Sequence, residues 1–325
     1  MPMDSKSLFR SAQPKSIMVV GDIMLDSYIW GSVDRISPEA PVPVVNVDST
    51  EDRLGGAANV VKNIASLGMK PILCSVVGDD EPGKKFFEIL RQRNITSDYC
   101  VVDSNRKTTI KTRVICGKQQ MLRVDTEQTD VISIDITEKL QKSIKTAIQQ
   151  ESISAIILQD YDKGVFSKNL IDFVVSEAKQ HNIPVLVDPK KRNFNNFKNV
   201  TLFKPNFKEF TEGLGKTCKK NDSEALFGLA KEFMSAQNIE TMMITLSELG
   251  IFVADKNHYV QIPTQVRHVA DVSGAGDTVI STASVCYVLG LPIEEVARIS
   301  NIAGGLVCEQ PGVVTIEKEQ LLNYI

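Results

Sequence analysis

The chain has 325 residues, 42% of them hydrophobic and 24% charged, which is ordinary usage for a globular protein. Lys and Arg number 37 and Asp and Glu number 40, so the net charge of −3 argues against a nucleic-acid binder, which would be strongly basic. The apolar stretch Val279–Leu291 is too short to span a membrane, and residues 1–15 lack the apolar core of a secretory signal. The six cysteines are scattered without a C-x-x-C pair, so we expect reduced thiols in a cytoplasmic enzyme. From the charge and the apolar runs, we expect that this enzyme binds neither nucleic acid nor membrane.

Short apolar runs alternate with helical patterns along most of the chain. The predicted strands are Ile17–Gly21, Ile72–Val77, Ala155–Leu158, Val185–Val187, Thr201–Phe203 and Met242–Thr245. The predicted helices are Ala57–Leu67, which stops at Gly68, and Pro82–Arg93, Leu170–Gln180 and Asn206–Leu214. This alternation predicts an α/β domain with a mainly parallel sheet that helices cover on both faces.

Two stretches interrupt the alternation. Residues of about 28–50 and 107–126 have apolar side chains at every second position and little helical signal, which predicts β-hairpins outside the main sheet. Open α/β sheets bind ligands at the carboxyl ends of their strands, so we expect these hairpins to form a small β-lid over that edge. The predicted organisation is an N-terminal tail over 1–15 and one domain over 16–325.

The strongest local motif is Asp271-Val272-Ser273-Gly274-Ala275-Gly276-Asp277-Thr278, followed by an apolar stretch that predicts a helix. Its glycines allow a tight turn that exposes N–H groups at the start of this helix, which is a ready anion site. From the residues alone, a glycine-rich turn with Asp277 as the helix N-cap explains the pattern equally well.

Two known phosphate-binding motifs are excluded. Gly274–Val279 does not have the G-x-G-x-x-G spacing of a dinucleotide fold. Gly215-Lys216-Thr217 resembles the end of a P-loop, but Phe210 stands where that loop needs its first glycine. We therefore expect Gly213 or Gly215 to end a helix.

Two segments resemble the signatures of the ribokinase-like carbohydrate kinase family. Asp271–Asp277 is similar to the D-x-x-G-A-G-D signature, and Leu54–Asn59 is similar to the G-G-x-x-N turn near the sugar. The similarity runs from about Ile17 to the C-terminus. Within the family, Gly21–Asp26 and Arg35–Pro43 resemble the kinases that act on D-glycero-β-D-manno-heptose 7-phosphate.

The resemblance implies a ribokinase-like three-layer α/β/α sandwich with a β-lid, and a homodimer joined through the lids. It implies ATP- and Mg²⁺-dependent phosphorylation of the heptose 7-phosphate at the C1 hydroxyl, in ADP-heptose synthesis for lipopolysaccharide. Because no H-x-G-H motif of a nucleotidyltransferase is present, we expect kinase activity alone. A monovalent-cation requirement stays open, as do two alternatives: another sugar or sugar-phosphate kinase of this fold, and a non-catalytic sugar-phosphate sensor.

The resemblance also assigns roles to residues around ATP. Asp277 matches the catalytic base, and the N–H groups of Ser273–Gly276, which include Gly274, Ala275 and Gly276, match the anion hole. The positions that match the nucleotide side are Asn206, Phe207, Lys208, Glu209, Thr245, Ser247, Gly250, Asp271 and Asn301. Glu209 would reach Mg²⁺ through water, although Asn206 and Glu209 also have the spacing of a helix capping box. Gly312-Val313 departs from the family's Gly-Thr, which leaves the adenine contact undecided.

On the sugar side, the matching positions are Asp22, Asp26, Gly55, Gly56 and Asn59. A phosphorylated sugar also needs cationic groups. The candidates are Lys111, Arg113, Arg123, Lys163, Lys190, Lys191 and Arg192, together with Asp160 in the Asp160–Gly164 turn, which resembles the family's D-Y-x-K-G segment. The sequence does not choose among these cations, each of which is equally explained as a solvated surface residue.

Overall fold

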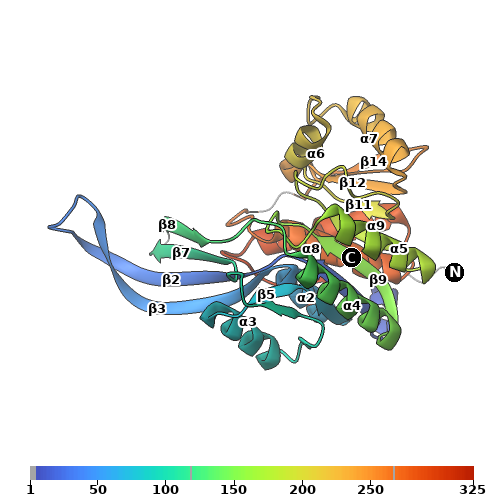
Figure 1. The fold of residues 1–325 in the computed structure, drawn as a ribbon. Coiled ribbons are helices and arrows are strands. Elements are labelled where there is room, and N and C mark those ends of the chain that lie inside the picture. Colours follow the sequence, from blue (N-terminus) through green and yellow to red (C-terminus); the bar gives the residue numbers. More distant parts are fainter. Residues whose placement is uncertain (1–4, 118, 266–267) are drawn as a thin grey trace.

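A computed structural model describes residues 5–117, 119–265 and 268–325, and a long sheet forms its centre (Figure 1). The strand order is β14-β13-β12-β11-β10-β9-β1-β4. The strands are β1 (Ser16–Gly21), β4 (Lys70–Cys74), β9 (Ile153–Gln159), β10 (Val185–Asp188), β11 (Leu202–Phe203), β12 (Thr241–Thr245), β13 (Ile251–Ala254) and β14 (Tyr259–Ile262). Pairing is parallel from β4 to β12 and antiparallel for β13 and β14, which confirms the predicted mainly parallel sheet.

Helices cover both faces of this sheet, so the predicted three-layer α/β/α sandwich is confirmed. On one face pack α1 (Ser5–Ser11), α2 (Ala57–Ser66), α3 (Glu81–Gln92), α8 (Ala275–Val288), α9 (Ile293–Cys308) and α10 (Lys318–Leu322). On the other pack α4 (Ile134–Gln150), α5 (Lys168–Gln180), α6 (Phe207–Leu214) and α7 (Ser223–Gln237). In β1, Ile17 and Val19 face one layer and Met18 and Val20 the other, because successive strand side chains point to opposite faces.

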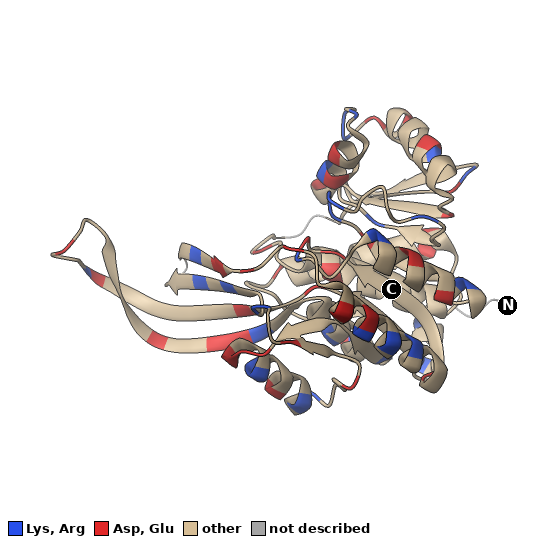
Figure 2. Ribbon diagram, viewed as in Figure 1, with Lys and Arg blue, Asp and Glu red and all other residues tan. Residues whose placement is uncertain are grey.

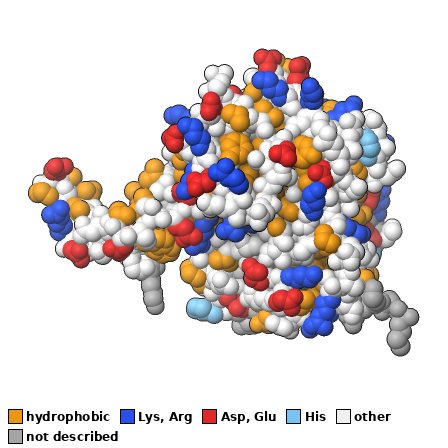
Figure 3. Space-filling view, turned by 90° about the horizontal axis from the view of Figure 1, so that it is seen from below, with side chains coloured by type: hydrophobic (Ala, Val, Ile, Leu, Met, Phe, Trp, Pro, Cys, Tyr) orange, Lys and Arg blue, Asp and Glu red, His pale blue; other side chains and the backbone are white. Residues whose placement is uncertain are grey.

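A second sheet projects from the body as a long arm (Figure 1). Its order is β3-β2-β7-β8, formed by β2 (Ile23–Ile36), β3 (Pro43–Gly56), β7 (Ile110–Cys116) and β8 (Gln119–Thr126). Both segments predicted as hairpins are therefore hairpins of one lid sheet, although the first begins at Ile23, nearer to the core than expected. Large exposed apolar side chains lie on this arm (Figure 3): Ile36, Val42, Val47, Met121, Leu122 and Val124.

Two sequence-based expectations need correction. The predicted strand Ile72–Val77 is two strands, because β4 ends at Cys74 and β5 (Val76–Gly78) pairs with β6 (Val101–Asp103) in a separate sheet. Ser75 makes the break: its hydroxyl donates to the Gly21 carbonyl at 2.6 Å, and its carbonyl accepts the Val101 N–H at 2.8 Å. The expected tail contains α1, whose Phe9 is buried, and residues 1–4 lie outside the described part of the chain.

Charged residues gather on the outer helices, α3 and α4 among them (Figure 2). No helix in the described ranges is long and apolar enough to cross a bilayer.

The carboxyl ends of the parallel strands β1, β9, β10, β11 and β12 lie at one edge of the sheet. Open α/β sheets bind ligands at this edge.

Candidate active site

Asp277 lies in the first turn of α8, buried at the carboxyl edge of the main sheet. Gly274 is the N-cap of this helix; its φ of +81° is in the left-handed region, and no side chain caps this end by a hydrogen bond. Asp277 is therefore not the N-cap, which was the alternative explanation of the glycine-rich motif. Its carboxylate instead points to side chains from other segments.

Three side-chain donors hold the Asp277 carboxylate. Oδ2 accepts a hydrogen bond from Asn59 Nδ2 at 2.8 Å, and Oδ1 accepts from the Tyr161 hydroxyl at 2.6 Å and from Gln159 Nε2 at 3.2 Å. Burial raises the pKa of Asp277 to about 6, and the hydrogen bonds from Asn59 and Tyr161 oppose that rise. Such a carboxylate is ionised at neutral pH yet more basic than a solvent-exposed one.

Four residues in the cluster around Asp277 were given no role from the sequence: Gln159, Tyr161, Asp188 and Lys204. Gln159 ends β9 and Asp188 ends β10, and Lys204 directly follows β11. Asp188 Oδ2 accepts from Gln159 Nε2 at 3.1 Å and pairs with the buried Lys204 ammonium at 3.1 Å. Their position in the sequence could have identified Gln159, Asp188 and Lys204 as site residues, because each is a polar residue that ends or follows a parallel strand.

The cluster also contains buried acceptors that receive no hydrogen bond. Among the described residues, these are Asn59 Oδ1, Gln159 Oε1 and Asp188 Oδ1. Buried oxygens almost always have a donor, so each such acceptor needs an explanation. A ligand rich in hydroxyl groups would supply the missing donors.

Asp22 accepts hydrogen bonds from three backbone N–H groups, and its contact with sugar hydroxyls stays a prediction. Asp22 Oδ2 accepts the N–H groups of Tyr161 at 2.8 Å and Lys163 at 3.1 Å, and Oδ1 accepts the Val165 N–H at 3.0 Å. It therefore shapes the loop after β9. Asp160 is also buried there and accepts from the Asp162 N–H and from Asn193 Nδ2.

Asp26, by contrast, faces the lid sheet. Its Oδ1 accepts from Arg113 on β7 at 2.5 Å. A Cβ added at Gly55 would lie 2.2 Å from Asp26 Oδ2, and one added at Gly56 would lie 2.5 Å from the Asp22 carbonyl oxygen. Both glycines are needed because the backbone passes close to these groups.

Most of the candidate phosphate-binding cations have an acidic partner. Lys111 pairs with Asp125 at 3.4 Å, Arg123 with Asp125 at 3.0 Å, and Lys163 with Glu127 at 2.9 Å. Arg192 instead donates to the Thr129 carbonyl at 2.6 Å, and Lys191 is exposed. The Arg123 side chain is 52% exposed, whereas those of Lys111, Arg113 and Lys163 are 13–17% exposed. The Arg123 side chain is therefore more exposed to solvent than the other three candidate side chains.

The N-x-x-E segment forms a capping box. Asn206 caps α6 by accepting the Glu209 N–H at 2.8 Å, and Glu209 Oε2 accepts the Asn206 N–H at 2.8 Å. Glu209 Oε1 pairs with Lys190, whose ammonium lies over the Tyr161 ring, 5.4 Å from its centroid. Phe207 is partly buried and packs against the core, and Lys208 is exposed and pairs with Glu212. Gly215, in the left-handed conformation, ends α6 and confirms the expected helix stop.

The remaining nucleotide-side positions lie at the end of β12, in the turn that follows it, and on α9. Thr245 ends β12, and the turn η1 (Ser247–Leu249) leads to Gly250, whose φ is +88°. Asn301 on α9 accepts the Thr264 hydroxyl at 3.2 Å and donates to the Pro263 carbonyl at 3.0 Å. It borders a small pocket lined by Ile262, Pro263, Thr264, Gln265, Arg298, Asn301, Ile302 and Gly305.

Of the four N–H groups of Ser273–Gly276 expected to form the anion hole, two donate to acceptors within the protein. The Ser273 N–H donates to Asp271 Oδ1 at 2.9 Å, and the Ala275 N–H donates to the Val272 carbonyl at 3.2 Å. Asp271 also accepts the Gly312 N–H at 2.9 Å, so this side chain holds two loops together. The N–H groups of Gly274 and Gly276 remain as donors for an anion.

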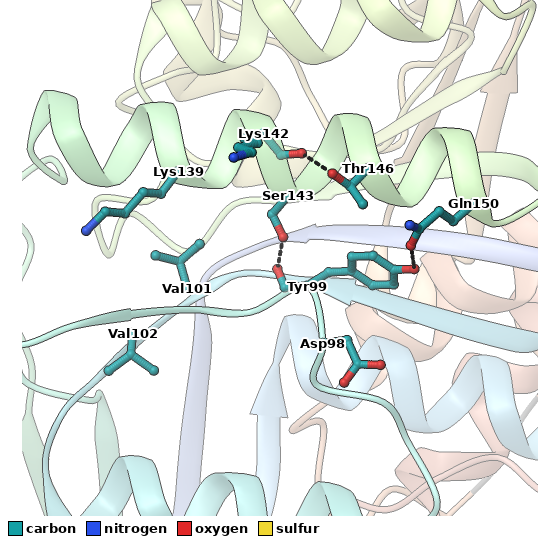
Figure 4. A pocket seen from close by; sticks show the side chains of 9 residues that line it. All are labelled: Asp98, Tyr99, Val101, Val102, Lys139, Lys142, Ser143, Thr146 and Gln150. Atoms are coloured by element: carbon teal, nitrogen blue, oxygen red, sulfur yellow. Dashed lines mark hydrogen bonds between the residues drawn. The ribbon is translucent and has the colours of Figure 1, made fainter.

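Within the described ranges, no three His, Cys, Asp or Glu side chains lie close enough to share a metal ion. A single carboxylate such as that of Glu209 suits a Mg²⁺ that keeps most of its water ligands. A wider groove lies between α4 and β6, lined by Tyr99, Val102, Lys139 and Lys142 among others (Figure 4). It shares no residue with the cluster around Asp277.

Residues 14–320 match the model of a family described as pfkB family carbohydrate kinase. The bifunctional protein HldE of Pelobacter propionicus is 37% identical over 327 residues, which cover 99% of this chain and 66% of that protein. The protein of the same name from Aliarcobacter butzleri is 39% identical over 313 residues, which cover 95% of this chain and 64% of that protein. The chain thus spans slightly less than two thirds of the length of these relatives.

Solved structures share the fold. Phosphofructokinase-2 from Escherichia coli, in complex with potassium, superposes with a TM-score of 0.77 at 18% identity, covering 96% of this chain and 99% of that one. A putative ribokinase from Agrobacterium tumefaciens has a TM-score of 0.73 at 16% identity, covering 96% and 97%. The architecture is therefore the ribokinase-like fold that the sequence predicted.

Proposed function

The chain belongs to the pfkB family of carbohydrate kinases, and on that premise we propose that it phosphorylates D-glycero-β-D-manno-heptose 7-phosphate at the C1 hydroxyl. ATP supplies the phosphoryl group, and the products are the 1,7-bisphosphate and ADP. This reaction is an intermediate step of ADP-heptose synthesis. Similarity to proteins named HldE at 37% and 39% identity supports this substrate, as do the segments Gly21–Asp26 and Arg35–Pro43.

The observation that carries the proposal is the buried Asp277 carboxylate at the start of α8. In this proposal, Asp277 takes the proton of the C1 hydroxyl as that oxygen attacks the γ-phosphorus of ATP. A pKa of about 6 leaves Asp277 ionised at pH 7 and close to the operating pH, where a general base works best. Phosphoryl transfer otherwise depends mainly on positioning and charge stabilisation.

The anionic phosphates would face the N-terminus of α8. The N–H groups of Gly274 and Gly276 and the helix dipole favour negative charge there. A Cβ added at Gly276 would lie 3.8 Å from Lys204 Nζ, so the buried Lys204 ammonium is close to this turn. Glu209 would hold Mg²⁺ through water, with Lys190 beside it. Mg²⁺ would supply charge neutralisation of the phosphates.

The sugar would lie between this cluster and the lid. Asn59 Oδ1, Gln159 Oε1 and Asp188 Oδ1 are the acceptors proposed for its hydroxyl groups. We assign the 7-phosphate to the lid-side cations Lys111, Arg113 and Lys163, because a mostly buried cation gains more from an added anion than an exposed one.

An ADP-release assay over a panel of sugars tests the proposal, with Asp277→Asn as the control. We expect the highest kcat/KM with the heptose 7-phosphate, and a loss of roughly 100- to 10,000-fold in the variant with ATP affinity retained. The variant should fold, because the Asn59 amide can turn its unpartnered Oδ1 toward the new NH₂ group. Comparable turnover in both forms would refute the assigned base.

The same assay separates the alternatives. Higher activity with fructose 6-phosphate or ribose than with the heptose phosphate would favour another kinase of this fold. An absence of ADP release with every sugar, together with measurable sugar-phosphate binding, would favour a non-catalytic sensor.

We also propose that two copies associate through their lid sheets. Val47 and Leu122 are 57% and 56% exposed on this sheet, and such apolar exposure is typical of an interface between proteins. Replacing both by Glu should convert a dimer to a monomer in analytical ultracentrifugation. Val102→Glu is the matched control, since Val102 is 47% exposed but lies on β6, away from the lid. A wild-type monomer, or a dimer that survives the double substitution, would contradict lid pairing.

A further inference from the structure

Tyr161 is partly buried in the loop after β9, and its side chain reaches the Asp277 carboxylate. The backbone N–H of Tyr161 donates to Asp22 Oδ2 at 2.8 Å, and its hydroxyl donates to Asp277 Oδ1 at 2.6 Å. Burial, and then the charges of Asp277 and Asp188, raise the pKa of Tyr161 well above its ordinary value. The hydroxyl is therefore protonated at every working pH and acts as a donor.

The two oxygens of Asp277 differ in how many donors they accept. A carboxylate offers about four lone-pair positions, two on each oxygen. Oδ1 accepts from both Tyr161 and Gln159, which fills its two positions, whereas Oδ2 accepts from Asn59 alone. One position on Oδ2 is left for a hydroxyl group of an acceptor.

We propose that Tyr161 is a positioning residue for phosphoryl transfer: with Gln159 it occupies Asp277 Oδ1, so that Oδ2 receives the proton of the sugar hydroxyl. This assignment rests on the proposed role of Asp277 as the base. The hydrogen bond fixes the rotation of the carboxylate and stabilises its ionised form. The Lys190 ammonium lies over the same ring, 5.4 Å from its centroid.

Tyr161→Phe removes the hydroxyl and keeps the ring. The lost hydrogen bond no longer stabilises the ionised carboxylate, so the acid limb of the kcat profile should move to higher pH by about one unit. At the pH optimum, kcat should fall roughly 10- to 100-fold because the carboxylate is less well oriented, while the KM for ATP should change little. Tyr99→Phe is the matched control, since the Tyr99 hydroxyl bonds only Gln150 and Glu151, outside the site.

A second measurement does not depend on turnover. In protein labelled with ¹³C at the aspartate carboxyl carbon, the Asp277 resonance, assigned by its absence in Asp277→Asn, should titrate at higher pH in Tyr161→Phe than in the wild type or in Tyr99→Phe. An unchanged titration midpoint, or an acid limb that does not move, would overturn the role of Tyr161. A shifted midpoint in a protein inactive with every sugar would support the Tyr161 contact and refute the proposed kinase function instead.

Discussion

Asn59 Nδ2 and Asp277 Oδ2 lie 2.8 Å apart although the two residues are 218 positions apart in the chain. Asn59 belongs to α2, at the end of the lid hairpin, and Asp277 belongs to the first turn of α8. This hydrogen bond joins the two sequence signatures into one site, and α2 and α8 pack against each other behind it. A substitution at the N-terminus of α2 or of α8 should therefore alter the position of the Asp277 carboxylate.

Gly274 tests this coupling. Its φ is +81°, and an added Cβ would lie 3.0 Å from Asn59 Nδ2. Gly274→Ala should cost about 1–2 kcal/mol of stability for the left-handed backbone, and should also lower kcat by displacing Asn59. Gly290→Ala is the matched control, because its φ is +80° and nothing lies within 4 Å of the added Cβ. Equal loss of activity in both variants, measured by ADP release at equal folded fraction, would contradict the steric explanation.

The pH dependence of the reaction should follow Asp277. Its pKa of about 6 is raised by burial, and only the ionised form can accept a proton. We therefore expect kcat/KM to be constant above about pH 7 and to fall tenfold per pH unit well below 6. A steady-state pH profile checks this, and an acid limb centred near pH 4 would show that the carboxylate is solvated in the working enzyme.

Lys204 and Asp188 form a buried ion pair at 3.1 Å, with both side chains at most 5% exposed. Lys204→Met should lower the free energy of unfolding by about 3–5 kcal/mol, because it leaves the Asp188 charge without its partner. The double variant Asp188→Asn with Lys204→Met should recover much of that loss, since the uncompensated charge is gone. Urea denaturation measures both, and a double variant no more stable than the single one would show that packing, not charge, was lost.

Asp160 should make the stability depend on pH in the direction opposite to that of a carboxyl whose pKa is lowered on folding. Burial, and then the neighbouring charge of Asp22, raise the pKa of Asp160 from 3.8 to about 7. Between these values Asp160 binds more protons in the folded chain than in the unfolded chain, so its contribution to the free energy of unfolding falls as the pH rises from about 4 to 7. Asp160→Asn should flatten this part of the Tm profile, and a profile identical to that of the wild type would contradict the raised pKa.

The alternation of apolar runs and helical patterns sufficed to predict the parallel sheet, its two helical layers and the lid. These features follow from local periodicity, because a strand buried on both faces must be apolar along its length, as β1 is. The pattern did not reveal that Ser75 divides one apparent strand into two. That break depends on the Gly21 carbonyl and the Val101 N–H, which come from distant segments.

The sequence by itself also singled out Asp277, Asn59 and the glycine turn, since short motifs carry their own spacing. Only the tertiary structure decided which side chains meet the carboxylate, because Gln159 reaches it from the end of β9, Tyr161 from the loop after β9 and Asn59 from α2. It also showed that Asp22 holds the Tyr161 loop through backbone N–H groups, while the contact of Asp22 with a sugar stays a prediction. Hydrogen bonds of this kind depend on ångström distances between segments, and no local pattern of residue types records those distances.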